Sequence, residues 1–144
     1  MKKIAFICTG NSARSQMAEG YGKYFAKLYG KDVEIYSAGS NPSGYVHPLA
    51  IKVMAEDGID ISQQYSKHID EIPINEVDYV ITLCGDAAET CPVVPGAKTE
   101  HWGLPDPARV IGPTEDAKLQ AFRKIRDQIK EKVERLIKEI ELKK

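Results

Sequence analysis

Hydrophobic positions follow two different repeats along the first half of the chain. Residues 3–8 (KIAFIC) form a short apolar run that stops at Thr9-Gly10-Asn11, which is typical of a buried strand ending in a turn. Apolar residues then recur every three or four positions from residue 13 to residue 29, which predicts a helix that ends at Gly30. Residues 33–37 (VEIYS) alternate between apolar and polar and predict a second strand.

The second half continues this succession of strands and helices. Pro48 and Gly58 suit the first turn and the end of a helix. Residues 77–83 (VDYVITL) predict a buried strand that runs into Cys84, and residues 99–102 predict a short fourth strand. From Thr114 onward the apolar residues again step by three or four, with Lys, Arg and Glu between them, which predicts a long amphipathic C-terminal helix.

Alternating strands and helices predict the fold class. We expect one α/β domain over residues 1–144, with a four-stranded parallel sheet and helices on both of its faces. Sites in such sheets lie at the carboxyl ends of the strands. Cys8 and Cys84 end two predicted strands, and His101 and Asp106 come at the end of another. These residues are therefore expected to gather at one edge of the sheet.

Composition and charge exclude several classes of protein. The chain is 42% hydrophobic and 28% charged, which argues against disorder. A net charge of -1 provides no basic field for nucleic acid or anionic lipid, so any anion must be bound locally. No apolar run is long enough for a membrane span, and residues 4–8 are too short for a signal peptide. We expect a cytoplasmic protein, in which the three cysteines are either core residues or reactive thiols.

Residues 8–15 (CTGNSARS) combine the features of an oxyanion loop with those of a nucleophile. Between a strand and a helix, backbone N–H groups can converge on an anion, and the helix N-terminus adds positive partial charge. Gly10 can take the positive φ that such a cradle usually needs, and Arg14 offers a fork of donors. This field favours the thiolate of Cys8, to which Ser15 can donate a hydrogen bond. The expected oxyanion-binding residues are Thr9, Gly10, Asn11, Ser12, Ala13 and Arg14.

Each candidate also has a plainer interpretation. Cys8 could be a core residue and Arg14 a solvated charge, although the strand before, the helix after and Ser15 argue for the functional interpretation. Cys84 and Cys91 could be buried bystander thiols. Metal binding explains them poorly, because their spacing is not that of a zinc site and no further ligand pair is present. The residues between them are polar and suit a segment that can rearrange around a disulfide.

Asp106 lies between two prolines in a stiff loop (GLPDPA). A carboxylic acid beside a bound anion could protonate a leaving oxygen. An ordinary turn aspartate is an equally good interpretation of the local sequence.

The segment from Cys8 to Glu19 (CTGNSARSQMAE) resembles the signature of the low-molecular-weight tyrosine phosphatase superfamily, and its SQMAE continuation resembles the arsenate reductase branch. The resemblance implies a phosphatase-like, flavodoxin-like fold, a bracing role for Asn11 and a general acid at Asp106. It implies no cofactor. Where many relatives have a second cysteine, this chain has Ala13.

The thioredoxin-coupled members of that branch carry a pair similar to Cys84 and Cys91. The resemblance therefore implies arsenic detoxification by a relay, in which Cys8 binds arsenate, Cys84 resolves the adduct and Cys91 exports the disulfide to thioredoxin. Phosphatases of this size usually have aromatic residues soon after the Asp-Pro, whereas this chain has Ala108-Arg109-Val110. That difference favours a small inorganic oxyanion over phosphotyrosine.

Some relatives bind potassium beside the loop, and Asn11, Glu19 and Ser62 are present here. Lys67 stands where an acidic residue would help, and a cation beside an ammonium is unfavourable, so no metal site is expected. The three histidines are expected to be ordinary polar residues.

Three other functions remain open. The chain could be a tyrosine phosphatase that works through a phosphocysteine intermediate, which would leave Cys84 and Cys91 unused. It could be a phosphocysteine carrier of a sugar transport system, although a loop arginine is not a feature of those proteins. It could also be a redox-sensing module that forms the disulfide without turning over an oxyanion.

Overall fold

The computed structural model describes residues 2–84, 97–104 and 114–140. Four strands form one parallel sheet in the order β2-β1-β3-β4. The elements in chain order are β1 (Lys2–Cys8), α1 (Arg14–Leu28), β2 (Val33–Gly39), α2 (Pro48–Glu56), η1 (Ile69–Glu71), β3 (Tyr79–Cys84), β4 (Lys98–Leu104) and α3 (Glu115–Glu139). The predicted α/β class and the four parallel strands are confirmed, and β2 and β4 extend beyond the predicted ranges 33–37 and 99–102.

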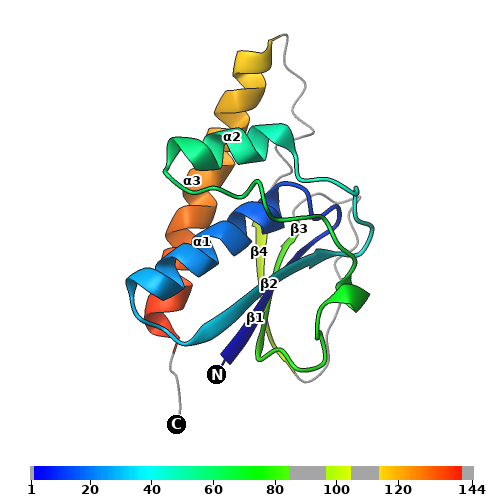
Figure 1. Cartoon of the computed structure of the whole chain (residues 1–144), viewed down its shortest axis with the longest axis vertical. Helices are drawn as coiled ribbons and strands as arrows, with labels where there is room; N and C mark the ends of the chain where they lie inside the picture. Colours follow the sequence, from blue (N-terminus) through cyan, green and yellow to red (C-terminus); the bar gives the residue numbers. More distant parts are fainter. Residues whose placement is uncertain (1, 85–96, 105–113, 141–144) are drawn as a thin grey trace.

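The two faces of the sheet are covered differently (Figure 1). All three α-helices pack on one face, where Ile4 and Phe6 of β1 join the apolar residues of α1, α2 and α3 in the larger core cluster. The opposite face carries Ala5 and Ile7, because side chains alternate along a strand. In the described part of the chain, η1 and the segment after it cover that face. Helices were expected on both faces of the sheet. In the described residues, three α-helices cover one face and the short 3-10 helix η1 lies on the other.

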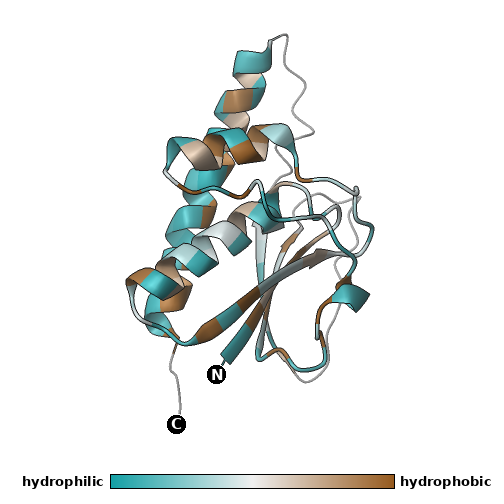
Figure 2. Ribbon diagram, viewed as in Figure 1, coloured by the Kyte–Doolittle hydropathy of each residue, from teal (hydrophilic) through white to brown (hydrophobic). Residues whose placement is uncertain are grey.

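The helix α3 closes the core across α1 and α2. Its buried residues recur at helical spacing, while its outer face is charged (Figure 2). They are Leu119, Phe122, Ile125, Ile129, Val133 and Ile137. The side chain of Thr114 caps the helix by accepting a hydrogen bond from Ala117 N at 3.2 Å. No helix in the described ranges has the length and apolarity needed to cross a membrane.

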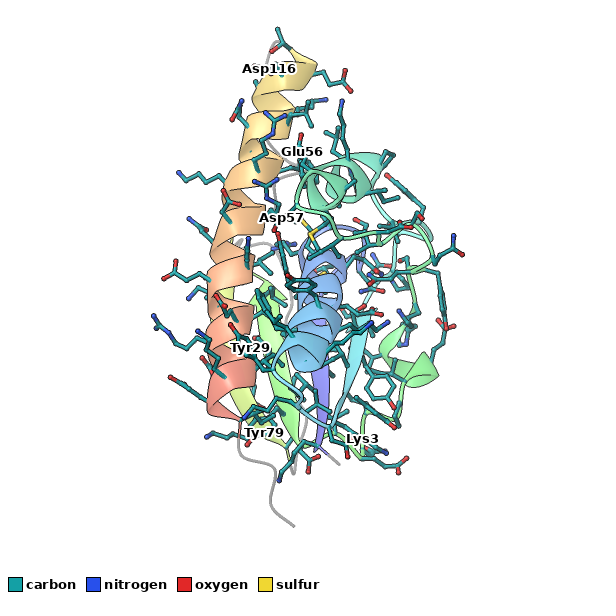
Figure 3. All side chains as sticks on the ribbon, turned by 60° about the vertical axis from the view of Figure 1, so that its left-hand side comes forward. Lys3, Tyr29, Glu56, Asp57, Tyr79 and Asp116 are labelled. Atoms are coloured by element: carbon teal, nitrogen blue, oxygen red, sulfur yellow. The ribbon has the colours of Figure 1, made fainter. Side chains whose placement is uncertain are left out.

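Two carboxylates at the end of α2 face basic side chains of α3 (Figure 3). Hydrogen bonding from Arg123 holds the pKa of Glu56 below its usual value. Burial alone would raise the pKa of Asp57, but hydrogen bonds from Lys130 and Tyr21 outweigh it and lower that pKa.

A carboxylate with a lowered folded-state pKa contributes stability that is present above its unfolded pKa and is lost as pH falls through the folded value. We therefore expect the melting temperature to fall as pH drops below about 4, the unfolded range of carboxyl groups. The Glu56→Gln/Asp57→Asn double variant should be less stable at neutral pH and show a shallower acid dependence. Equal acid slopes in thermal melts of the two proteins would contradict this assignment.

Candidate active site

Residues 8–15 span the end of β1, the loop 9–13 and the start of α1, at the carboxyl edge of the sheet (Figure 1). Cys8 is the last residue of β1 and is buried, with 2% of its surface exposed. Ala13 occupies the N-cap of α1 and provides no side-chain cap. The side chain at the N-cap therefore does not occupy the backbone N–H groups of the first turn. An anion site at a helix N-terminus requires these N–H groups to be available.

A chain of hydrogen bonds leads from Asn11 to the sulfur of Cys8. The Oδ1 of Asn11 accepts the backbone N–H of Lys67 at 2.9 Å, so its Nδ2 faces Ser15 and donates to Oγ at 2.7 Å. The Ser15 hydroxyl hydrogen is then left for Cys8 Sγ, 2.9 Å away. The backbone N–H of Asn11 also donates to this sulfur, at 3.2 Å. Two hydrogen-bond donors therefore converge on the sulfur of Cys8.

The position of the left-handed turn in the loop differs from the expectation. Gly10 does not adopt a positive φ, whereas Asn11 does, with φ of 47°. Asparagine tolerates this conformation better than most residues, and here its side chain is held at both ends. The local sequence offers two residues suited to a positive φ, and the loop uses Asn11 and not Gly10.

The segment 40–47 turns the loop carbonyls outward. Backbone N–H groups of this segment donate to the carbonyls of Cys8, Thr9, Gly10 and Ser12 over 2.8–3.3 Å. Peptide units whose carbonyls point away direct their N–H groups toward the opposite, concave side, which is the geometry of an anion-binding nest. This bracing is long-range and has no signature within residues 8–15.

Gly39, at the end of β2, permits the close approach of this loop. A Cβ built there would lie 2.4 Å from the carbonyl oxygen of Thr9, whereas a Cβ on Gly10 would meet nothing nearer than 3.8 Å. We expect Gly39→Ala to destabilise the fold by about 2 kcal/mol or more through backbone displacement, and Gly10→Ala to cost less than about 1 kcal/mol. Urea unfolding of the two variants tests this order, and a larger loss for Gly10→Ala would contradict it.

Arg14 begins α1 and its side chain is buried. Its Nη1 donates to the backbone carbonyl of Leu104 at 2.9 Å and to that of Leu83 at 3.2 Å. Those two residues directly precede Cys84 and residue 105. The guanidinium is thus held by the ends of β3 and β4, the strands that lead to the other candidate residues.

Cys84 ends β3, the neighbour of β1 in the sheet. Ile7 pairs with Thr82, so the backbone positions of Cys8 and Cys84 fall at adjacent strand ends on one edge. Cys91 and Asp106 lie outside the described residues. His101 lies on β4 with its Nδ1 2.7 Å from the hydroxyl of Thr82.

A second brace of the loop, made by residues 64–67, was not among the predicted site features. The buried Gln16 donates through Nε2 to Asn11 Oδ1 and to the carbonyl of Tyr65, both at 2.9 Å. The Ser66 hydroxyl donates to the carbonyl of Gly10 at 3.1 Å, and Gln64 donates to Gln16 Oε1 at 2.8 Å. Gln16, a polar residue on the inner face of α1, was the one feature of the local sequence that could have indicated these contacts.

Glu19, one of the residues considered for a potassium site, is contacted by other protein groups. The Nζ of Lys67 lies 3.7 Å from Glu19 Oε1, and the Ser37 hydroxyl donates a hydrogen bond to the same oxygen. Ser62 is exposed, and its backbone N–H donates to Asp60. Among the described residues, no group of three His, Cys, Asp or Glu side chains could hold a metal.

Similarity to known proteins provides evidence that is independent of this geometry. Residues 3–144 match the sequence model of the family described as low molecular weight phosphotyrosine protein phosphatase. An arsenate reductase of Bacillus licheniformis is 50% identical over 135 residues, 93% of this chain and 94% of that protein. An arsenate reductase of Bacillus subtilis is 51% identical over 129 residues, 89% of each chain. A solved structure of an arsenate reductase in the phosphate-binding state is 40% identical, with a TM-score of 0.81 over 98% of this chain and 100% of that one.

Proposed function

The chain belongs to the low molecular weight phosphotyrosine protein phosphatase family, and on that premise we propose that it is a thioredoxin-dependent arsenate reductase. The observation that carries this proposal is the placement of Cys8 within a braced anion loop, with Cys84 at the end of the adjacent strand. The relatives at about half identity that bear the name arsenate reductase support it. We place the reaction in the cytoplasm and in a single domain over residues 1–144.

The first step is attack of the Cys8 thiolate on arsenate held by the loop. Arg14 and the loop N–H groups neutralise the oxyanion, while Ser15 and Asn11 orient the sulfur. A sulfur–arsenic bond forms and one arsenate oxygen leaves as water. We assign the proton for that oxygen to Asp106, which the sequence places in the loop after β4.

The second step reduces arsenic. The Cys84 thiolate attacks Cys8 Sγ, a disulfide forms, and the electron pair of the broken sulfur–arsenic bond stays on arsenic, which leaves as arsenite. Cys91 then attacks Cys84, which frees Cys8 as a thiolate and leaves a Cys84–Cys91 disulfide. A thioredoxin dithiol supplies two electrons and two protons to restore both thiols. The sum is arsenate plus a dithiol giving arsenite, water and a disulfide.

Phosphatase chemistry is the second candidate, because the same loop would hold phosphate and Cys8 would form a phosphocysteine. It needs neither Cys84 nor Cys91. The two functions therefore differ in their dependence on these residues, and weak phosphatase activity is compatible with the first.

Arsenate-dependent NADPH oxidation with thioredoxin and thioredoxin reductase tests the proposal, run beside para-nitrophenyl phosphate hydrolysis. We expect sustained NADPH consumption that is lost in Cys84→Ser, while phosphate-monoester hydrolysis in that variant is unchanged. Hydrolysis with no arsenate-driven turnover in the unmodified protein would establish a phosphatase instead.

A further inference from the structure

A buried ion pair lies behind the anion loop, and the relay does not use it. Lys67 is 8% exposed and Glu19, on α1, is 5% exposed. The Nζ of Lys67 lies 3.7 Å from Glu19 Oε1 and donates to the backbone carbonyl of Tyr65 at 2.9 Å. Burial lowers the pKa of Lys67, and the attraction of Glu19 opposes that effect. Buried charges are costly, so a pair retained in this place calls for a role.

The backbone of Lys67 contacts the loop and its support directly. Its N–H donates to Asn11 Oδ1 and its carbonyl accepts the N–H of Gly39, both at 2.9 Å. Lys67 is thus attached at two points. Its side chain contacts Glu19 on α1, and its backbone N–H, together with Gln16 Nε2, determines which way the Asn11 amide faces. That orientation directs Ser15 toward the sulfur of Cys8.

We propose that Lys67 is a positioning residue for the oxyanion loop, whose ammonium anchors residues 65–67 on Glu19 and thereby holds the Asn11–Ser15–Cys8 chain. This inference rests on the proposed role of Cys8 as the anion-facing nucleophile. It does not depend on whether that nucleophile reduces arsenate or hydrolyses a phosphate ester.

Glu19 offers a matched control within the same chain. Its other oxygen, Oε2, accepts from Lys23 at 2.6 Å, and the Lys23 side chain is 55% exposed. Lys23→Ala removes an ammonium from the same carboxylate without touching residues 65–67. An exposed pair on one helix contributes little, whereas loss of the buried partner removes the anchor.

The test follows alkylation of Cys8 by iodoacetamide, resolved by peptide mass spectrometry, and its protection by inorganic phosphate. We expect Lys67→Ala to raise the half-protecting phosphate concentration about tenfold, the scale of one lost positioning hydrogen bond. Lys23→Ala should change it less than about twofold, as expected for an exposed pair. Ethylammonium chloride should restore protection in Lys67→Ala, whereas sodium chloride at equal ionic strength should not.

A merely structural role for Lys67 would not give rescue by a small ammonium ion. Wild-type protection in Lys67→Ala, or an equal loss in Lys23→Ala, would overturn the proposal. If Lys67→Ala does not fold, the Glu19→Gln/Lys67→Met variant leaves no unpaired buried charge, and wild-type phosphate protection in it would overturn the proposal equally. Because no arsenate is used, failure of arsenate turnover in the unmodified protein would refute the proposed function alone.

Discussion

Cys8→Ser is expected to abolish arsenate reduction, with a loss of at least about a thousandfold, the scale seen when a covalent nucleophile is removed. A serine hydroxyl is a far weaker nucleophile than a thiolate at neutral pH. It also cannot form a disulfide, so electrons could not pass from Cys84 to arsenic even if an ester formed. Arsenate-dependent NADPH oxidation measures this loss directly.

The same substitution should leave the anion site largely assembled. The loop carbonyls are held by the segment 40–47, and Asn11 is held by Lys67 and Ser15, so none of these contacts needs the sulfur. Calorimetric titration with inorganic phosphate should therefore still detect binding. Retained arsenate reduction in Cys8→Ser would refute the mechanism, whereas loss of both binding and turnover would show that the sulfur supports the loop structurally.

The fold was predictable because each element carries a periodic pattern of its own. The apolar runs that end at Cys8 and Cys84 are buried strands, and the three-to-four spacing of α3 matches its buried face. Coverage of the second face was harder to predict. In the described residues it comes from η1 and an irregular segment, whose apolar members Ile69, Ile72 and Val77 follow no helical or strand period.

The chemistry-bearing part of the site was predictable for a different reason. Cys8, Arg14 and Ser15 lie close together in sequence, and the strand and helix around them determine their approximate geometry. The braces were not predictable, since Gly39 and Lys67 are distant from the loop along the chain and contact it only in the folded sheet. The anchoring of Arg14 by the carbonyls of Leu83 and Leu104 is equally invisible, because any residue provides a carbonyl.

The carbonyl of Leu83 also matters for the second prediction, which concerns Cys84 and Cys91. It accepts a hydrogen bond from Arg14, and Leu83 immediately precedes Cys84. The backbone at Cys84 is thus tied to the anion loop before any chemistry occurs. In the proposed relay, a resolving thiol at Cys84 therefore starts one strand away from the nucleophile. In that relay, the role of Cys91 is to move the disulfide onward.

Cys91→Ser is therefore expected to release about one equivalent of arsenite per protein and then stop, as the exchange sequence requires. The trapped product should be a Cys8–Cys84 disulfide, seen as a linked peptide pair by mass spectrometry without reduction. Cys84→Ser is the matched control, because it removes the resolving thiol and should release no arsenite. Sustained turnover in Cys91→Ser would mean that the reductant attacks the Cys8–Cys84 disulfide directly. A stalled protein with no such disulfide would remove Cys84 from the relay.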